Sequence, residues 1–278
     1  GTESSPVIFT SQRDVLAGAY KKTSSFAGLF SSPVAGDWSR VEVKNGGVIE
    51  ADHAVFRYGG KPVYRGMQWG LTASQISSSV SILGGGKGVF QNSVFRDSFV
   101  NSGFAEGNAS LYTEGALNVT TSVEILNSIF AGGYYGAIFD AHSSDFLLSA
   151  LVQNTVFSDF SAPRGTILFR RTIPSMEGLS FENNADSHVF CLTCSVQRGA
   201  SVTLDSSAKV YAEGVEILDG GMLVLQSGSS VSFAGDTGIE VQSGGTFISA
   251  GSAEARNMFS PLVESSPWSG INVFASGT

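Results

Sequence analysis

The chain has 278 residues and a net charge of −8, and its composition narrows the classes of protein to which it can belong. Hydrophobic residues make up 42%, enough to bury a sizeable core, whereas charged residues make up only 14%, well below the roughly 25% of a typical soluble domain. The acidic balance, without any stripe of lysine or arginine, argues against nucleic acid as a partner. Serine, glycine or charge interrupts every apolar stretch, so the sequence predicts no membrane span.

Short runs rich in Val, Ile, Phe and Thr alternate with Gly, Ser, Asn and Asp, which predicts an all-β chain of many short strands. In chain order, the expected strand cores are Val7–Phe9, Val41–Val43, Val80–Leu83, Val123–Leu126, Thr166–Phe169, Val202–Leu204 and Met222–Leu225. The abundance of glycine and phenylalanine, 34 and 20 residues, suits a fold with tight turns and stacked flat side chains.

An internal repeat gives the strongest indication of architecture. Five segments align without gaps and place phenylalanine at one position, occupied by Phe56, Phe95, Phe130, Phe157 and Phe181. Asparagine stands three residues earlier in the middle three segments, at Asn92, Asn127 and Asn154. The spacing between phenylalanines falls from 39 to 35, 27 and 24 residues, and a coil of about 20–25 residues holds three short strands that pair in parallel with the next coil.

The repeat therefore predicts a parallel β-helix in which the rings stack inside and the asparagines form a turn ladder. The alternative is an antiparallel sandwich with coincidental repeats, which would not need Phe and Asn in fixed register. His53 takes the asparagine position of its segment, where it is expected to cap the ladder. A second ladder of Val55, Val94, Ile129 and Val156 precedes the rings, and either the chain bends so that it is internal or it forms an exposed apolar stripe.

The whole chain, 1–278, is predicted to be one continuous β-helix. Residues 1–200 form coils with long inserted loops, and residues 201–278 form tighter, more regular coils. The predicted loops are Val15–Val34, Lys61–Ser79 and Asn101–Gly115, because the repeat spacing there is too long for one coil.

The first 60 residues contain three motifs in order: Pro6–Ser11, then Gly36-Asp37-Trp38, then Ala54–Gly60. In this order they resemble the right-handed β-helix, pectin-lyase-like repeats of large bacterial surface and secreted proteins. Ser39-Arg40 departs from the glycines that usually follow the tryptophan. The resemblance implies a right-handed coil and says little about activity.

The motif order restarts at residue 251, where Pro267-Trp268 follows Gly251 as Gly36-Asp37-Trp38 follows Gly1. This order is typical of a piece of a longer tandem array, in which further coils would cover the terminal strand edges. An isolated chain is then expected to associate end to end or to fray at its first and last coils.

Carbohydrate lyases and hydrolases with this fold use acidic clusters with Arg, Lys or His on one coil face, sometimes with calcium. Residues of these types gather near predicted strand ends, and they are Asp140, His142 and Asp145, then Arg170 and Arg171, then Glu182, Asp186 and His188. Stacked coils could bring them together, but their spacing matches no recognised catalytic signature, and the alternative is that they are solvated loop residues.

Cys191 and Cys194 are the two cysteines of the chain, in the order Cys-Leu-Thr-Cys. A zinc ribbon would need a second pair, and the sequence around them continues as a strand rather than as a redox-active helix start. A small structural disulfide is expected, with free buried thiols and a redox or metal role as alternatives. No cofactor and no metal site are predicted.

The leading function is a structural and adhesive segment of a large exported cell-surface protein that presents loops to glycans, to other surface proteins or to copies of itself. An extracellular or cell-surface location is expected. An enzymatic role is disfavoured, and the alternative is a polysaccharide lyase or glycoside hydrolase that acts on an acidic polysaccharide.

Overall fold

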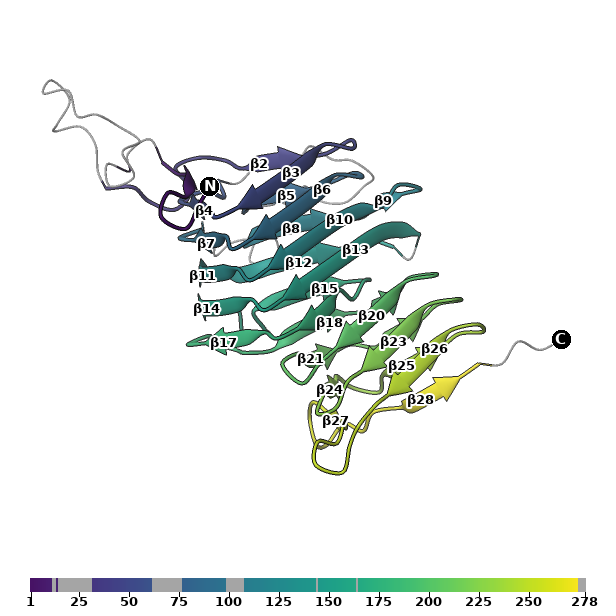
Figure 1. Ribbon diagram of the computed structural model, residues 1–278. Coiled ribbons are helices and arrows are strands. Elements are labelled where there is room, and N and C mark those ends of the chain that lie inside the picture. Colours follow the sequence, from purple (N-terminus) through teal and green to yellow (C-terminus); the bar gives the residue numbers. More distant parts are fainter. Residues whose placement is uncertain are drawn as a thin grey trace, which may run out of the picture.

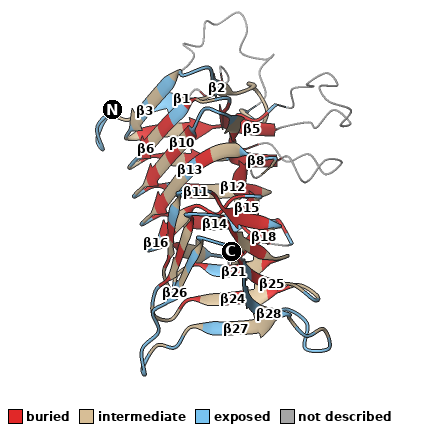
Figure 2. Ribbon diagram, turned by 90° about the vertical axis from the view of Figure 1, so that its right-hand side faces the viewer, coloured by how far each residue is buried: buried red, intermediate tan, exposed pale blue. Residues whose placement is uncertain are grey.

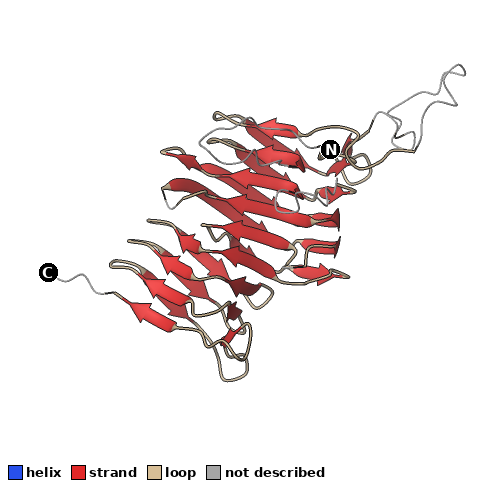
Figure 3. Cartoon of the chain, turned by 180° about the vertical axis from the view of Figure 1, so that it is seen from behind, coloured by secondary structure: helices blue, strands red, loops and turns tan. Residues whose placement is uncertain are grey.

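The computed structural model describes residues 1–11, 14, 32–61, 77–98, 108–143, 145–163 and 165–274. Within these ranges the chain contains strands and turns and no helix (Figure 3). The strands form stacked sheets in which neighbours come from successive passes of the chain, from the N-terminal strands to the C-terminal strands (Figure 1). The fold is therefore all-β with parallel sheets, an arrangement consistent with a solenoid.

Four sheets make up the stack. Sheet 1 contains β1 (Val7–Phe9), β4 (Ala54–Arg57), β7 (Val94–Arg96), β11 (Ile129–Gly133), β14 (Val156–Phe160) and β17 (Ser180–Glu182). Sheet 2 contains β3 (Val48–Asp52), β6 (Lys87–Gln91), β10 (Thr121–Leu126), β13 (Phe146–Gln153), β16 (Ser175–Glu177), β20 (Ser201–Leu204), β23 (Met222–Leu225) and β26 (Thr246–Ser249), with β9 (Ala116–Leu117) antiparallel to β13.

Sheet 3 contains β2 (Val41–Val43), β5 (Ser77–Ile82), β8 (Asn108–Glu114), β12 (Tyr135–Asp140), β15 (Ile167–Arg170), β18 (Val189–Leu192), β21 (Lys209–Ala212), β24 (Ser230–Phe233) and β27 (Met258–Pro261). Sheet 4 contains β19 (Cys194–Val196), β22 (Val215–Ile217), β25 (Gly238–Val241) and β28 (Gly270–Val273).

The path of the chain changes once along the stack. From β3 to β15 each pass visits sheets 2, 1 and 3, whereas from β20 onward each pass visits sheets 2, 3 and 4. A two-residue corner, such as Asn92-Ser93, leads from sheet 2 into sheet 1. After β20 this corner is replaced by the longer turn Asp205–Ala208, and the chain enters sheet 3 directly. The pass that contains β16 to β19 visits all four sheets.

The phenylalanine repeat forms one column of rings inside the stack. Phe56, Phe95, Phe130 and Phe157 are fully buried and occupy paired positions on adjacent strands of sheet 1. Their ring centroids lie 4.8, 4.4 and 5.0 Å apart, with nearly parallel planes. Half-buried Phe181 extends the column below Phe157 at 5.8 Å. The rings thus lie on one face and in one core, as the fixed register of the repeat predicts.

Phe9 extends the same column at its other end, although its segment was not part of the aligned repeat. Its ring stacks on Phe56 with a centroid distance of 4.7 Å, and its backbone pairs with that of Phe56. The column belongs to a buried cluster whose members range from Val43 to Val241. In Figure 2 the buried residues, in red, lie along the strands of the stack.

Asparagine occupies the corner because the backbone there is left-handed. Asn92, Asn127 and Asn154 have φ of 50°, 48° and 49°, a region that asparagine tolerates better than most residues. The ladder amides lie near the surface, where Asn154 Nδ2 donates to Asn127 Oδ1 at 3.3 Å. His53 has the same conformation with φ 52°, and its Nδ1 lies 2.8 Å from Asp52 Oδ1.

An inward-facing hydroxyl follows each corner asparagine, a feature that the repeat alone does not predict. Ser93, Ser128 and Thr155 are buried, and their side chains donate to backbone carbonyls two residues earlier at 2.9 Å. Ser93 N also donates to Ser128 Oγ of the next pass at 3.1 Å. These hydroxyls satisfy backbone groups where the chain turns between two sheets, which a buried corner requires.

Of the two interpretations of the aliphatic ladder, the structure favours the exposed stripe. The stripe lies on the outer face of sheet 1, where Ile129 is 44% exposed and Val55, Val94 and Val156 are half-buried. No bend brings these side chains inside, because alternate residues of an extended strand point to opposite faces and the rings occupy the inner one.

Two of the three predicted loops are partly wrong. The end of Lys61–Ser79 forms the start of β5, and Asn108–Glu114 within Asn101–Gly115 forms β8, both within sheet 3. The error arose because serine, asparagine and alanine weaken the strand signal, whereas both faces of these strands are buried. Residues 62–76 and 101–107 of these loops, and residues 15–31 of Val15–Val34, lie outside the described residues.

Candidate functional site

The densest group of charged side chains lies at the carboxyl ends of three neighbouring strands of sheet 3. Glu114 of β8 pairs with Asp140 of β12, which pairs with Arg170 of β15. Their neighbours Phe139 and Phe169 are buried in the core, so the alternation of the strands directs the charged side chains to the outer face. We refer to Glu114, Asp140, His142, Arg170 and Arg171 as the sheet 3 charge cluster.

His142 joins the two carboxylates of the cluster. The backbone at His142 is left-handed, with φ 52°, and its N–H donates to Asp140 Oδ1 at 2.8 Å. This turn places Nδ1 of the ring 3.2 Å from Asp140 Oδ1 and Nε2 3.5 Å from Glu114 Oε2. The imidazole is therefore held between one carboxylate from its own pass and one from the preceding pass.

The arginines contact the same residues from the following pass. Arg170 Nη1 lies 3.4 Å from Asp140 Oδ2, and Arg171 donates from Nη1 to the His142 carbonyl. Tyr112 lies in the same strand as Glu114, and its hydroxyl donates to Glu114 Oε2 at 3.3 Å. Asp140 thus has a cationic partner on each of its oxygens.

These contacts fix the protonation states in the cluster. Hydrogen bonds to Asp140 and then to Glu114 raise the pKa of His142 from 6.5 to about 10. Burial opposes ionisation of Asp140, but the hydrogen bonds and the charge of His142 outweigh it and hold the pKa of this carboxyl below its usual value. At neutral pH His142 is a cation and Asp140 an anion, and neither is poised to exchange a proton.

Four of the predicted candidates are thus brought together, and Asp145 is not. Asp140, His142, Arg170 and Arg171 belong to the cluster, whereas Asp145 is exposed just before β13, and in the described part of the chain it has no ion pair with them. Glu114 and Tyr112 were missed, because only the register of sheet 3 shows that they lie beside residues 26 positions later.

The structure separates one member of the second predicted group, Glu182, from the other two, Asp186 and His188. Asp186 and His188 are in contact and repeat the Asp-x-His turn, since the His188 N–H donates to Asp186 Oδ1 at 3.1 Å. The imidazole of His188 stacks on Tyr211, with ring centroids 3.8 Å apart. Glu182 is exposed at the end of β17 in sheet 1, and no described interaction joins it to this pair.

The motifs that carry the family resemblance converge into a polar network beside the first strand. Arg57 forms an ion pair with buried Asp14, and Thr10 Oγ1 donates to Asp14 Oδ2 at 2.6 Å. Trp38 Nε1 donates to the Arg57 carbonyl at 2.8 Å. Residues separated by up to 47 positions thus contact one another, which gives these motifs a role in packing.

Cys191 and Cys194 form a disulfide, with Cα atoms 5.6 Å apart. Both are buried, at the end of β18 and the start of β19, where the chain passes from sheet 3 into sheet 4. Thr193 between them has φ 43°, a left-handed conformation that is costly for a β-branched residue.

Within the described ranges, no group of three or more His, Cys, Asp or Glu side chains is arranged to hold a metal ion. A search of the same residues finds no helix long and apolar enough to cross a membrane. No family of known proteins, no curated protein and no solved structure matches the chain.

Proposed function

We propose that the chain is a rigid structural and adhesive segment of a large exported cell-surface protein, built as a right-handed parallel β-helix of the pectin-lyase-like kind. The observation that carries the proposal is the column of phenylalanine rings, which stacks pass upon pass inside the sheets. Such a column gives the scaffold its length and stiffness, because each pass buries its core only against its neighbours.

The charge cluster supports a structural role. Its members satisfy one another, with Asp140 held by His142 and Arg170 and with Glu114 contacted by His142 and Tyr112. A general base needs a pKa near the working pH, and the pKa of His142 lies well above neutrality at about 10. The cluster therefore serves to tie three successive passes together on the outer face of sheet 3.

In this proposal, recognition takes place on the segments that connect the strands, at an extracellular or cell-surface location. Glycans, other surface proteins and further copies of the chain are the proposed partners. Segments on a rigid scaffold can vary without disturbing the core, which is why binding so often resides in them. The connections between β1 and β2, β4 and β5, and β7 and β8 are the long ones in this chain.

A polysaccharide lyase or hydrolase is the second candidate. The observation in its favour is that Glu114, Asp140 and His142 lie together at the carboxyl ends of strands of sheet 3, where His142 is exposed although Asp140 is buried. Catalysis there would require a substrate to displace the contacts that hold the cluster.

Two assays on the purified chain distinguish the candidates. In the first, beads coated with the chain are tested for adhesion to immobilised glycans and to cells, with beads coated with the unfolded chain as the control. In the second, uronate polymers are incubated with the chain, with and without calcium, and soluble oligosaccharides are measured. Adhesion without release supports the scaffold. Release that is lost in Asp140→Asn would establish the enzyme and overturn the scaffold proposal.

A further inference from the structure

Sheet 1 ends at β17, partway along the stack, and this leaves a strand edge away from both ends of the molecule. Within the described chain β17 pairs with β14 alone, whereas sheets 2, 3 and 4 continue beyond this level. Figure 1 shows β17 at the end of sheet 1, with β21, β24 and β27 displaced to the right below it. The edge exists because the path of the chain changes after β17.

The backbone at this edge lacks the partners that it has in the earlier passes. The carbonyl of the residue just before each sheet 1 strand accepts from the next pass at 2.8, 3.0 and 3.0 Å, and these residues are Ser93, Ser128 and Thr155. Leu179 has the equivalent position before β17, and no described donor reaches its carbonyl. The Ser180 N–H donates toward β14, so the N–H and C=O of Phe181, the next residue, point to the open side.

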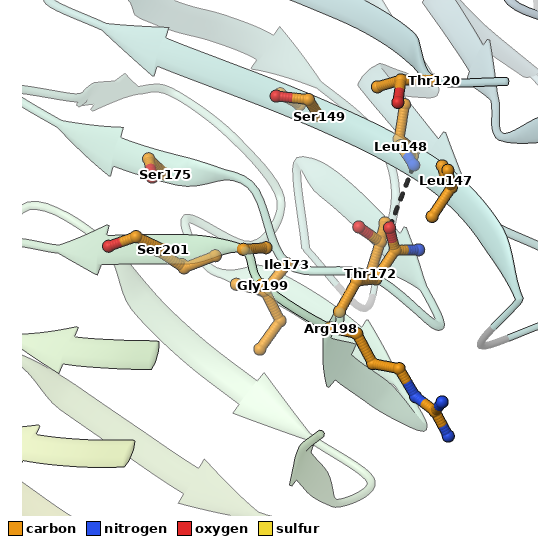
Figure 4. Close-up of a pocket in the computed structure, with 14 residues that line it drawn as sticks. Thr120, Leu147, Leu148, Ser149, Thr172, Ile173, Ser175, Arg198, Gly199 and Ser201 are labelled. Atoms are coloured by element: carbon orange, nitrogen blue, oxygen red, sulfur yellow. Dashed lines mark hydrogen bonds between the residues drawn. The ribbon is translucent and has the colours of Figure 1, made fainter. Parts of the chain in front are cut away.

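A comparable break in sheet 2 is closed by a side chain. There β13 begins before its neighbour β16, and their pairing starts only at Leu151. Buried Gln197 reaches back about 50 residues, so that Oε1 accepts from the Leu148 N–H at 3.1 Å, the dashed line in Figure 4, and Nε2 donates to the Phe146 carbonyl. In the described chain no side chain does the same for β17, and its edge groups remain open to a partner.

The column of phenylalanine rings also ends at this edge. Phe181 stacks on Phe157 at 5.8 Å, and no ring of the described chain lies against its other side. The four rings from Phe56 to Phe157 have a ring on each side and are fully buried, whereas Phe181 is only half-buried. One more aromatic side chain at the same position of a following strand would complete its burial.

The charge beside the open ring specifies the next residue of such a strand. Glu182 follows Phe181 on the outer face, is exposed and forms no ion pair with any described residue. In the register of sheet 1, its position is that of Arg57 in β4 and of Arg96 in β7. A strand with a basic residue after its phenylalanine would therefore place that charge directly beside Glu182.

We propose that the β17 edge binds an extended segment of another protein, of the type aliphatic–Phe–basic, as a parallel seventh strand of sheet 1. Addition of a strand to an open edge uses backbone hydrogen bonds for affinity and alternate side chains for specificity. A folded second copy is a poor donor, because its two segments of this type lie in β4 and β7, which are paired on both sides. The inference goes beyond the scaffold function and does not depend on it, since the edge is separate from the long connections.

The probe is a fluorescent peptide with the sequence of Gln91–Asp97, capped at both ends, titrated with the folded full chain and followed by fluorescence polarisation. In the proposed register its Val94, Phe95 and Arg96 lie against Ser180, Phe181 and Glu182. We expect saturable binding of one peptide per chain. A peptide with Phe95→Ala should bind at least about tenfold more weakly. A peptide with Arg96→Glu should lose less, because its ion pair is exposed.

Methylated peptides test whether the backbone is used. In a parallel pair the peptide N–H groups of Val94 and Arg96 donate to the carbonyls of Leu179 and Phe181, whereas the N–H of Phe95 points away. N-methylation at Val94 or at Arg96 should therefore abolish binding, and N-methylation at Phe95 is the matched control that should leave it nearly unchanged.

Protein variants and hydrogen exchange locate the site. Glu182→Lys should reverse the preference, so that the Arg96→Glu peptide binds better than the original. Glu240→Lys makes the same change at an exposed position of β25 and should leave the preference as it is. The Phe181 amide should exchange more slowly when peptide is bound, whereas the Ser180 amide, which already donates to Thr155, should change little.

Each contrary result overturns a stated part of the proposal. Absence of saturation would remove the site. Equal losses for all three methylated peptides, or no protection of Phe181, would show that the peptide does not pair with this edge, and an unchanged preference in Glu182→Lys would refute the register. Dimers of the chain that the peptide disperses would make a second copy the occupant. None of these outcomes decides the adhesion assay, so the scaffold function and this site fail separately.

Discussion

Replacing Phe130 with alanine should destabilise the chain far more than replacing its neighbour Ile129. Phe130 is fully buried, and its ring stacks between Phe95 and Phe157 with centroids 4.4 and 5.0 Å away. Large-to-small changes of a buried phenylalanine cost about 3–5 kcal/mol through lost burial and the cavity left behind. Because two stacked pairs are lost at once, we expect a value in the upper part of that range.

Ile129→Ala is the matched control, because it lies in the same strand and points to the opposite face. Ile129 is already 44% exposed, so its truncation removes only part of the roughly 1.5–3 kcal/mol that full burial of such a side chain provides. The expected loss for Ile129→Ala is about 1 kcal/mol. The contrast between the two variants tests the assignment of inner and outer faces directly.

Both variants can be compared by urea titration and by thermal unfolding followed by circular dichroism. For a chain of this size, about 4 kcal/mol corresponds to a fall in the unfolding temperature of roughly 8–15 °C. The reasoning would be refuted if Phe130→Ala and Ile129→Ala lost similar amounts, or if Ile129→Ala lost more, because either result would place the ring outside the core.

Three further predictions concern the turns and the charge cluster. Asn127, with φ 48°, should tolerate glycine with little change in urea midpoint, whereas Asn127→Val should cost about 1–2 kcal/mol, and equal effects would contradict the left-handed corner. Thr193→Asn should raise the unfolding temperature by relieving about 0.5–1 kcal/mol of left-handed strain at φ 43°, and a lower temperature would show that the threonine makes compensating contacts. The pKa of His142 is raised from 6.5 to about 10 by Asp140 and Glu114, so its stabilising contribution is complete below pH 6.5 and is lost as the pH rises through about 10. The urea midpoints of the native chain and of His142→Gln should therefore converge across this interval, and a constant difference would contradict the charged state of the imidazole.

The repeat could be predicted from the sequence because the five passes through sheet 1 from β4 to β17 use phenylalanine for the same physical task. Only a flat ring fills the inner column at Phe95 and Phe130, and an asparagine suits the left-handed corner before it. Strands β1, β2 and β23 match their predicted bounds, because each short run with β-branched or aliphatic residues lies close to a turn residue, such as Pro6 before β1, Asn45 after β2 and Gly221 before β23.

The parts that were missed depend on contacts between distant passes. β8 carries asparagine, alanine and serine, which are poor strand formers, and its place in sheet 3 follows from burial on both faces. Glu114 belongs to the charge cluster only because β8 and β12 are in register, and Gln197 acts on a strand about 50 residues earlier. No local pattern marks such residues, since their partners are set by the order of strands in the stack.

The stacking of successive passes along one axis is the central claim, and one distance tests it most directly. Glu50 of β3 and Ile248 of β26 are exposed on the outer face of sheet 2, and their strands are seven steps apart in the order of that sheet. At 4.7–4.9 Å per step, spin labels at these two positions should be separated by about 34 Å in a pulsed electron paramagnetic resonance measurement.

Labels at Glu124 and Ile248, five steps apart, should give about 24 Å, so the two pairs should differ by about 10 Å. Agreement with both values would support one continuous stack of parallel strands from β3 to β26. Distances that do not grow with the number of steps, or a Glu50–Ile248 separation no longer than the Glu124–Ile248 separation, would contradict it.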